Sequence, residues 1–276
     1  MTSAGGSRRL PVALAAAAIL VAVALVGVLA ARLGDDAVRV QPAGDASQAR
    51  EAALPEPVTP AFVPPAPRPL AGQENVARWS PVRRTAAIRS GPGGGEPVIG
   101  RLETRTPEGT RNLVLVLARR RDERGTLWVR ARLPILENGA VGWVPRAALG
   151  GYGAVRTHLV VDRARFRATL FRDGSPVFRA VVGVGRLESP TPAGEFYVRN
   201  KLRRYANAFY GPVAFGTSAR SATLTDWPAG GFVGIHGTNR PDLLPGRVSH
   251  GCIRLRNDDV LALERLMPVG TPLTIL

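Results

Sequence analysis

The only cysteine of the chain and two of its three histidines lie within one short, Gly-rich segment. This segment, "GIHGTNRPDLLPGRVSHGCIRL", spans residues 234–255 and contains His236, His250 and Cys252. A thiol becomes an effective nucleophile when a nearby base or positive charge favours its thiolate form. The pattern therefore predicts nucleophilic catalysis, with Cys252 as the nucleophile and His236 as its base. His158 stands alone on a predicted strand, and we expect it to be structural.

The separation between His236 and Cys252 indicates which elements must position them. It is too long for a pair on one helix, and it suits two neighbouring β segments joined by a loop. Residues two apart in an extended segment share a face, so His250 and Arg254 should border the thiol. Gly251 permits close backbone approach, and the amides of Gly251 and Cys252 are candidate donors to an oxyanion. Arg254 suits a carboxylate or carbonyl.

These residues also allow two other interpretations. A lone cysteine is often a small buried hydrophobe. A zinc site formed by His236, His250 and Cys252 has three ligands and lacks the usual ligand spacing. We expect no metal and no cofactor, and a single cysteine excludes an intramolecular disulfide.

The segment resembles the catalytic signature of the L,D-transpeptidases of bacterial peptidoglycan. "IHGTN" followed by "SHGCIRL" carries the resemblance, and "HLVVDRARFRATLFRDGSPVFRAVVGVG" with "SPTPAGEFYV" is similar to the first half of the same domain, over about residues 155–276. The resemblance implies a β-sandwich-like fold with Cys252 as nucleophile and His236 as general base, its second nitrogen held by a carbonyl near Gly237. It places His250 and Gly251 at the oxyanion site.

The resemblance also implies a substrate and a reaction. The enzyme would cross-link the third residues of peptidoglycan stem peptides through a thioester on Cys252, release D-alanine and be acylated by carbapenems. An L,D-carboxypeptidase or exchange enzyme, and a non-catalytic wall-binding envelope protein, stay open as alternatives. Residues 205–221 are interpreted as a substrate-facing loop. The expected substrate contacts are Ser249, Arg254, Gly237, Thr238, Asn239, Tyr210 and Phe215.

Charge and composition narrow the class of partner. Basic residues number 37 against 21 acidic ones, a formal net charge of +16, and Lys201 is the only lysine. The arginines are dispersed, aromatics make up only 6% of the chain, and no nucleic-acid module is present, which argues against nucleic acid. The excess of arginine is best explained as a compositional habit of the genome, and it is also compatible with a protein on an anionic cell envelope. We expect a monomer.

Four regions are predicted, and the fold class is mainly β. Residues 1–33 form a cytoplasmic tail and a transmembrane anchor, or a signal peptide, because residues 10–31 are uncharged, apolar and long enough to span a bilayer. Arg8 and Arg9 favour an inside N-terminus and therefore an exported, membrane-anchored chain. Residues 34–77 form a Pro/Ala-rich linker. Residues 78–150 resemble a small Src-homology-three-like β-barrel, and residues 151–276 form the catalytic domain.

Local patterns predict several individual elements. Arg124-Gly125 and Asn138-Gly139 indicate hairpin turns, and Asp173-Gly174 indicates another turn within an antiparallel meander. "FVGIH" predicts a strand that ends at His236. "NDDVLALERLMP" predicts a helix capped by Asn257 or Asp258.

Overall fold

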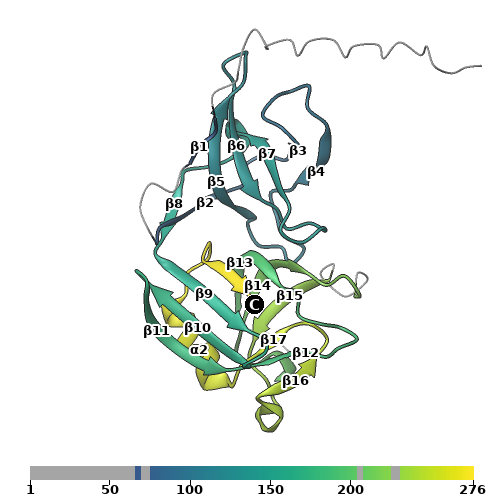
Figure 1. Ribbon diagram of the computed structural model, residues 1–276, viewed down its shortest axis with the longest axis vertical. Helices are drawn as coiled ribbons and strands as arrows, with labels where there is room; N and C mark the ends of the chain where they lie inside the picture. The colour runs from purple at the N-terminus through teal and green to yellow at the C-terminus, as the bar shows by residue number, and fades with distance from the viewer. Residues whose placement is uncertain (1–65, 70–74, 204–207, 225–230) are drawn as a thin grey trace, which may run out of the picture. The chain divides into compact units, whose positions relative to one another are not determined.

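The computed structural model describes residues 66–69, 75–203, 208–224 and 231–276 (Figure 1). The chain divides into two units, residues 1–62 and 63–276, and all described residues belong to the second. The predicted anchor in residues 1–33 and most of the predicted linker lie outside the described residues. Among the residues described, no helix is long and apolar enough to cross a membrane.

The first sheet is antiparallel throughout and has the order β4-β3-β7-β6-β5-β2-β8, with β1 paired to β5. The turns predicted at Arg124-Gly125 and Asn138-Gly139 are confirmed, since they connect β5 to β6 and β6 to β7. Gly125 and Gly139 have φ angles of 77° and 85°, which residues other than glycine rarely adopt. The strands are β1 (Arg68–Pro69), β2 (Ala77–Pro81), β3 (Ala86–Arg89), β4 (Val98–Leu102), β5 (Leu113–Arg121), β6 (Leu127–Arg132), β7 (Val141–Pro145) and β8 (Gly153–Val155), with the 3₁₀ turn η1 (Arg146–Ala148) before β8.

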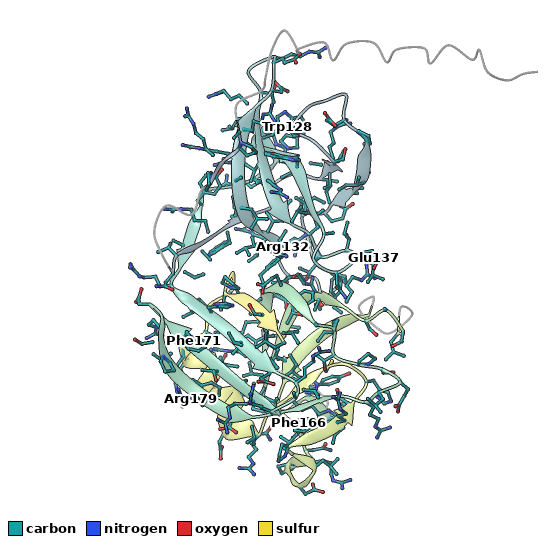
Figure 2. All side chains as sticks on the ribbon, viewed as in Figure 1. Trp128, Arg132, Glu137, Phe166, Phe171 and Arg179 are labelled. Atoms are coloured by element: carbon teal, nitrogen blue, oxygen red, sulfur yellow. The ribbon has the colours of Figure 1, made fainter. Side chains whose placement is uncertain are left out.

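Trp128 and Trp143, on β6 and β7 of this sheet, are packing residues. Trp128, labelled in Figure 2, and Trp143 are 4% and 6% exposed. The indole N–H of Trp128 donates to Asp122 at 2.9 Å. Rings buried in this way stabilise the sheet and offer little surface to a ligand. The likeness of this sheet to Src-homology-three-like barrels stays a prediction.

The second sheet contains the remaining strands and has the order β11-β10-β9-β18-β13-β14-β15-β17-β12-β16. The predicted meander is confirmed, because β10 pairs antiparallel with both β9 and β11. Ala168 and Leu170 are buried in the core, and their neighbours on β10 are more exposed, as in a strand with one face on the core. The strands are β9 (Thr157–Asp162), β10 (Arg167–Arg172), β11 (Ser175–Val181), β12 (Gly183–Gly185), β13 (Gly194–Arg203), β14 (Val213–Arg220), β15 (Phe232–His236), β16 (Gly246–Ser249), β17 (Ile253–Arg254) and β18 (Pro272–Ile275), with 3₁₀ turns η2 (Ala208–Tyr210) and η3 (Pro241–Leu243).

The helix α2 (Asn257–Leu266) packs on the second sheet (Figure 1). Val260 and Leu263 are fully buried in the same core cluster as the sheet residues Leu159, Phe196 and Ile235. The helix itself was predicted, but the predicted cap is wrong: Arg256 is the N-cap residue and its side chain makes no capping bond. The Asn257 side chain is instead committed to the loop that follows β15, as described below.

The interpretation of residues 205–221 as one loop is also wrong. Residues 213–220 form β14, which lies between β13 and β15 inside the second sheet. Seven of its eight residues are buried, so "VAFGTSAR" lacks the alternation of a half-exposed strand. Residues 204–207 lie outside the described residues. The 3₁₀ turn η2 is the described segment just before β14, and it lies beside the candidate site.

Candidate active site

Two neighbouring strands bring the predicted nucleophile and base together. β15 pairs parallel with β17, with His236 opposite Arg254, and Cys252 directly precedes β17. The amide of Gly234 donates to the Cys252 Sγ at 3.3 Å. A Cβ placed on Gly234 would lie 3.8 Å from both this sulfur and the Cδ2 of His236. The sulfur and the imidazole therefore flank the same point on β15, as the predicted strand arrangement requires.

One imidazole nitrogen of His236 is fixed by the backbone. The Nδ1 atom lies 2.6 Å from the carbonyl oxygen of Gly237, so Nδ1 carries the proton and donates it. This tautomer leaves Nε2 as the acceptor available to a proton from substrate or thiol. The side chain is 2% exposed, and burial lowers the pKa of His236 to about 4, because the stabilising bond to Gly237 is outweighed by desolvation and by the Arg254 charge.

The Cys252 thiol is shifted in the opposite direction. Burial raises its pKa above the ordinary value, although the Gly234 amide and the Arg254 charge both favour the thiolate. A base with a lowered pKa beside a thiol with a raised pKa predicts a neutral thiol and a neutral imidazole at rest near pH 7. The proton must then move during the reaction rather than before it.

Ser249 and Thr191 brace the turn that presents the thiol. The Ser249 hydroxyl donates to the carbonyl of Cys252 at 2.6 Å and accepts from the amide of Gly251 at 3.1 Å. The Thr191 hydroxyl donates to the Gly251 carbonyl at 2.7 Å and accepts from the amide of Gly185 at 2.8 Å. Gly251 has φ of 114°, which strains any other residue. The turn is therefore held from both sides.

This arrangement corrects the predicted role of Gly251. Its amide is occupied by the Ser249 hydroxyl, so it is not a free oxyanion donor. Ser249 is 1% exposed, and its hydroxyl bonds are internal, although the residue lines the pocket. Both residues therefore act here through the conformation of the turn.

The loop after β15 is locked to the start of α2. The Asn257 side-chain oxygen accepts from the amide of Thr238 at 3.0 Å. A Cβ on Gly237 would lie 2.3 Å from that oxygen, so only glycine fits there. The Thr238 hydroxyl accepts from the amide of Arg240 at 3.0 Å. Asn239 is exposed.

Aromatic rings and one arginine form the pocket around the thiol. The Tyr210 ring lies edge-on to His236 at 4.9 Å between centroids, and Arg254 stacks on Phe209 at 4.5 Å. Arg254 is 7% exposed, and its Nε has no hydrogen-bond partner within the described parts of the chain. The pocket is open to solvent, and its enclosed volume is only about 40 Å³. Its lining comprises Phe209, Tyr210, Ser221, Leu224, Gly231, Phe232, Val233, His236, Ser249, His250, Cys252 and Arg254.

The predicted site residues fall into two groups. The pocket brings together Cys252, His236, His250, Arg254, Tyr210 and Ser249. Gly237, Thr238 and Asn239 lie in the adjoining loop and are not among the lining residues. Phe215 is fully buried in the core of the second sheet, so its expected substrate contact is not supported by its position.

Sequence reasoning missed several members of the site. Phe209 and Phe232 line the pocket, Thr191 braces the turn, and Asn257 secures the loop after His236. The aromatic content of "YANAFYG" was a usable signal for Phe209. Thr191 lies in the Pro-rich segment "SPTPAG", but nothing local indicates its distant partner Gly251. No group of three or more His, Cys, Asp or Glu side chains suited to a metal occurs in the described ranges.

Comparisons with known proteins identify the family that this part of the chain matches. The family model is YkuD, the L,D-transpeptidase catalytic domain, and it matches residues 156–275. YkuD of Bacillus subtilis, named as an L,D-transpeptidase, is 35% identical over 118 residues, covering 43% of this chain and 65% of that protein. YbiS of Escherichia coli, also so named, is 30% identical over 135 residues, covering 42% and 44%.

A solved structure of an L,D-transpeptidase from Mycobacterium tuberculosis has a TM-score of 0.39 at 19% identity, covering 60% of this chain and 90% of that one. The chain spans less than two thirds of the length of either curated relative. The resemblance predicted for about residues 155–276 is thus confirmed: residues 156–275 match the L,D-transpeptidase catalytic domain.

Proposed function

We propose that the chain is a cysteine-dependent L,D-transpeptidase that cross-links the third residues of peptidoglycan stem peptides. One observation carries the proposal: the Cys252 sulfur and the His236 imidazole flank one point of β15 inside a single pocket, and Gly237 fixes the imidazole tautomer. The match of residues 156–275 to the L,D-transpeptidase catalytic domain supports this substrate class.

The first half-reaction would form a thioester and release D-alanine. The Cys252 sulfur attacks the carbonyl carbon of the third residue of a tetrapeptide donor, and its proton passes to Nε2 of His236. The Cys252 amide and the adjoining His250 are the candidate groups to stabilise the resulting oxyanion. When the C–N bond breaks, His236 returns that proton to the amine of the departing D-alanine.

The second half-reaction would transfer the acyl group to an acceptor. A side-chain amine from another stem peptide attacks the thioester carbonyl and loses a proton to His236 as the bond to nitrogen forms. Collapse of this intermediate breaks the C–S bond, and the Cys252 thiol regains its proton from His236. Water in place of the amine would make the same site a carboxypeptidase.

Arg254 is the candidate anchor for a donor oxygen. Its guanidinium is nearly buried in the pocket wall, and its Nε has no protein partner among the residues described. A buried donor of this kind is costly unless a ligand satisfies it, so a carboxylate or carbonyl of the donor is a suitable partner. The nearby positive charge also favours the thiolate as it forms.

Incubation with disaccharide-tetrapeptide and mass analysis of the products tests this proposal, with Cys252→Ala as the matched control. The wild-type protein should give dimers linked between third residues, and a carbapenem should add its mass to the wild type alone. Tripeptide without dimers would identify a carboxypeptidase. No product and no adduct would refute the catalytic proposal and favour a wall-binding protein.

We further propose that the protein acts in the cell envelope. Its substrate class lies outside the cytoplasm, and the apolar residues 10–31 would hold it at the membrane, as their sequence predicts. Fractionation of cells that produce the full chain, followed by carbonate extraction of the membranes, tests the anchor directly.

A further inference from the structure

A charged side chain is completely buried between β13 and the first sheet. Arg199 is 2% exposed and is the largest fully buried side chain among the described residues. It occupies a register shift of β13, between Val198 and Asn200, where the pairing with β14 is interrupted. A bulge of this kind redirects a side chain, and bulges are frequent beside active sites.

The partner of this arginine comes from the loop between β4 and β5 in the first sheet. Arg199 donates to a carboxylate oxygen of Glu108 at 2.9 Å and, through Nε, to the carbonyl of Thr217 at 2.7 Å. The Asn200 side chain donates to the second oxygen of Glu108 at 3.0 Å. The Glu108 side chain is only 15% exposed. Removing one member of such a pair leaves a buried, uncompensated charge.

A face of the Arg199 guanidinium also contacts the wall of the active-site pocket. Its Cζ lies 3.7 Å from the centroid of the Phe232 ring, and Phe232 lines the pocket together with Cys252. Stacking of a guanidinium on an aromatic face at this distance is favourable and directional. Glu108, Arg199 and Phe232 thus form a continuous line of contacts from the first sheet to the pocket wall.

A second residue of the first sheet reaches the same ring by another route. The Asn138 side chain donates to the carbonyl of Arg220 at 2.7 Å and accepts from its amide at 2.9 Å. The Arg220 guanidinium lies 5.0 Å from the centroid of Phe232. Arg220 is also the residue paired with Phe232 between β14 and β15. The Phe232 ring therefore contacts two arginines, each held by a residue of the first sheet.

We propose that Glu108 and Asn138 are positioning residues, which act through Arg199 and Arg220 to fix the Phe232 wall of the active-site pocket. The first sheet then sets the donor affinity of the catalytic site without contacting the donor. This inference rests on the proposed function only in that the donor is a stem peptide.

The test is a double-variant cycle between Glu108→Gln and Phe232→Ala in the full chain carrying Cys252→Ala. Calorimetry with disaccharide-tetrapeptide measures the donor Kd, and Glu108→Gln should weaken binding about tenfold, within the range of coupling for residues of one interaction network. In the Phe232→Ala background the same change should have no further effect. Glu123→Gln makes the same charge change at an exposed position of the first sheet and should leave Kd unchanged.

A second readout separates this inference from the proposed function. Cys252 of the otherwise wild-type chain is alkylated with the bulky N-phenylmaleimide and, separately, with the small iodoacetamide. The ratio of the two rates measures how far the pocket wall restricts access to the thiol, and it requires no stem peptide. Suppose that tetrapeptide fails to bind, that Glu108→Gln changes this ratio, and that Glu108→Gln causes no further change in the Phe232→Ala background. The proposed function then fails, and the inference holds. Asn138→Ala should change the same ratio if Glu108→Gln does not fold. Unchanged Kd and unchanged ratio, or additive effects in the cycle, overturn the inference.

Discussion

The pH dependence of the first half-reaction tests the electrostatics of the site most directly. Burial lowers the pKa of His236 to about 4, and Gly237 holds its Nδ1 proton, so Nε2 is an acceptor over most of the acid range. The acid limb of kcat/KM for D-alanine release should therefore lie near pH 4. An unperturbed histidine would place it near 6.5.

The size of the effect is large at pH 5.5. With a pKa of about 4, about 97% of His236 is neutral at that pH, against about 10% for an ordinary histidine. The structure thus predicts that protonation of His236 reduces kcat/KM only slightly at pH 5.5, whereas protonation of an ordinary histidine would reduce it about tenfold. The thiol pKa is raised, so alkylation of free Cys252 should keep rising above pH 8.

The assay is D-alanine release from disaccharide-tetrapeptide at low substrate concentration from pH 4 to 9, with circular dichroism at each pH to verify folding. Iodoacetamide alkylation of Cys252 over the same range supplies the thiol titration. An acid limb near pH 6.5, or a thiolate already formed between pH 5 and 7, would refute the neutral pair. The site would then hold a thiolate–imidazolium pair at rest.

Three further predictions concern stability and the turn. Because folding lowers the pKa of His236, the unfolded chain binds one more proton than the folded chain between pH 6.5 and 4. The free energy of unfolding should therefore fall by about 3 kcal/mol as pH drops through that window. Urea titrations of His236→Gln should show a smaller fall. Thr191→Val should lower the free energy of unfolding in urea by about 1–3 kcal/mol and should also lower kcat/KM, because the Gly185 amide loses its acceptor. Thr191→Ser keeps the hydroxyl and should behave as wild type. Gly237→Ala should cost about 1–3 kcal/mol, because its Cβ would clash with Asn257, whereas Gly95→Ala, with no atom within 4 Å of its Cβ, should leave the melting temperature unchanged.

Short-range patterns predicted the parts of the fold that depend on neighbouring residues. The hairpins at Asn138-Gly139 and Asp173-Gly174 follow from turn chemistry, and the strand that ends at His236 follows from its apolar run. β14 was missed because both of its faces are buried, which removes the period-two signal. The cap of α2 was wrong because Asn257 bonds to Thr238 across the loop, a preference that local sequence does not reveal.

The same distinction applies to the site. Cys252 and His236 were recognisable because their side chains are rare and chemically specific, and a family signature surrounds them. Phe232 and Thr191 are ordinary residues whose roles come from long-range contacts, to Arg199 in one case and to Gly251 in the other. Pairings of this length are set by the register of the whole sheet rather than by the spacing of residues along the chain.

The opposite pKa shifts of Cys252 and His236 constrain how the proton can move. A thiol with a raised pKa does not lose its proton to an imidazole of pKa about 4 before substrate binds, because that transfer is unfavourable. The transfer becomes favourable only as the sulfur bonds to the carbonyl carbon and its acidity rises. Arg254 and the Gly234 amide favour the negative charge on sulfur at that stage, and desolvation strengthens both effects. In the proposed reaction the thiol therefore stays protonated until substrate binds, and its deprotonation is coupled to attack.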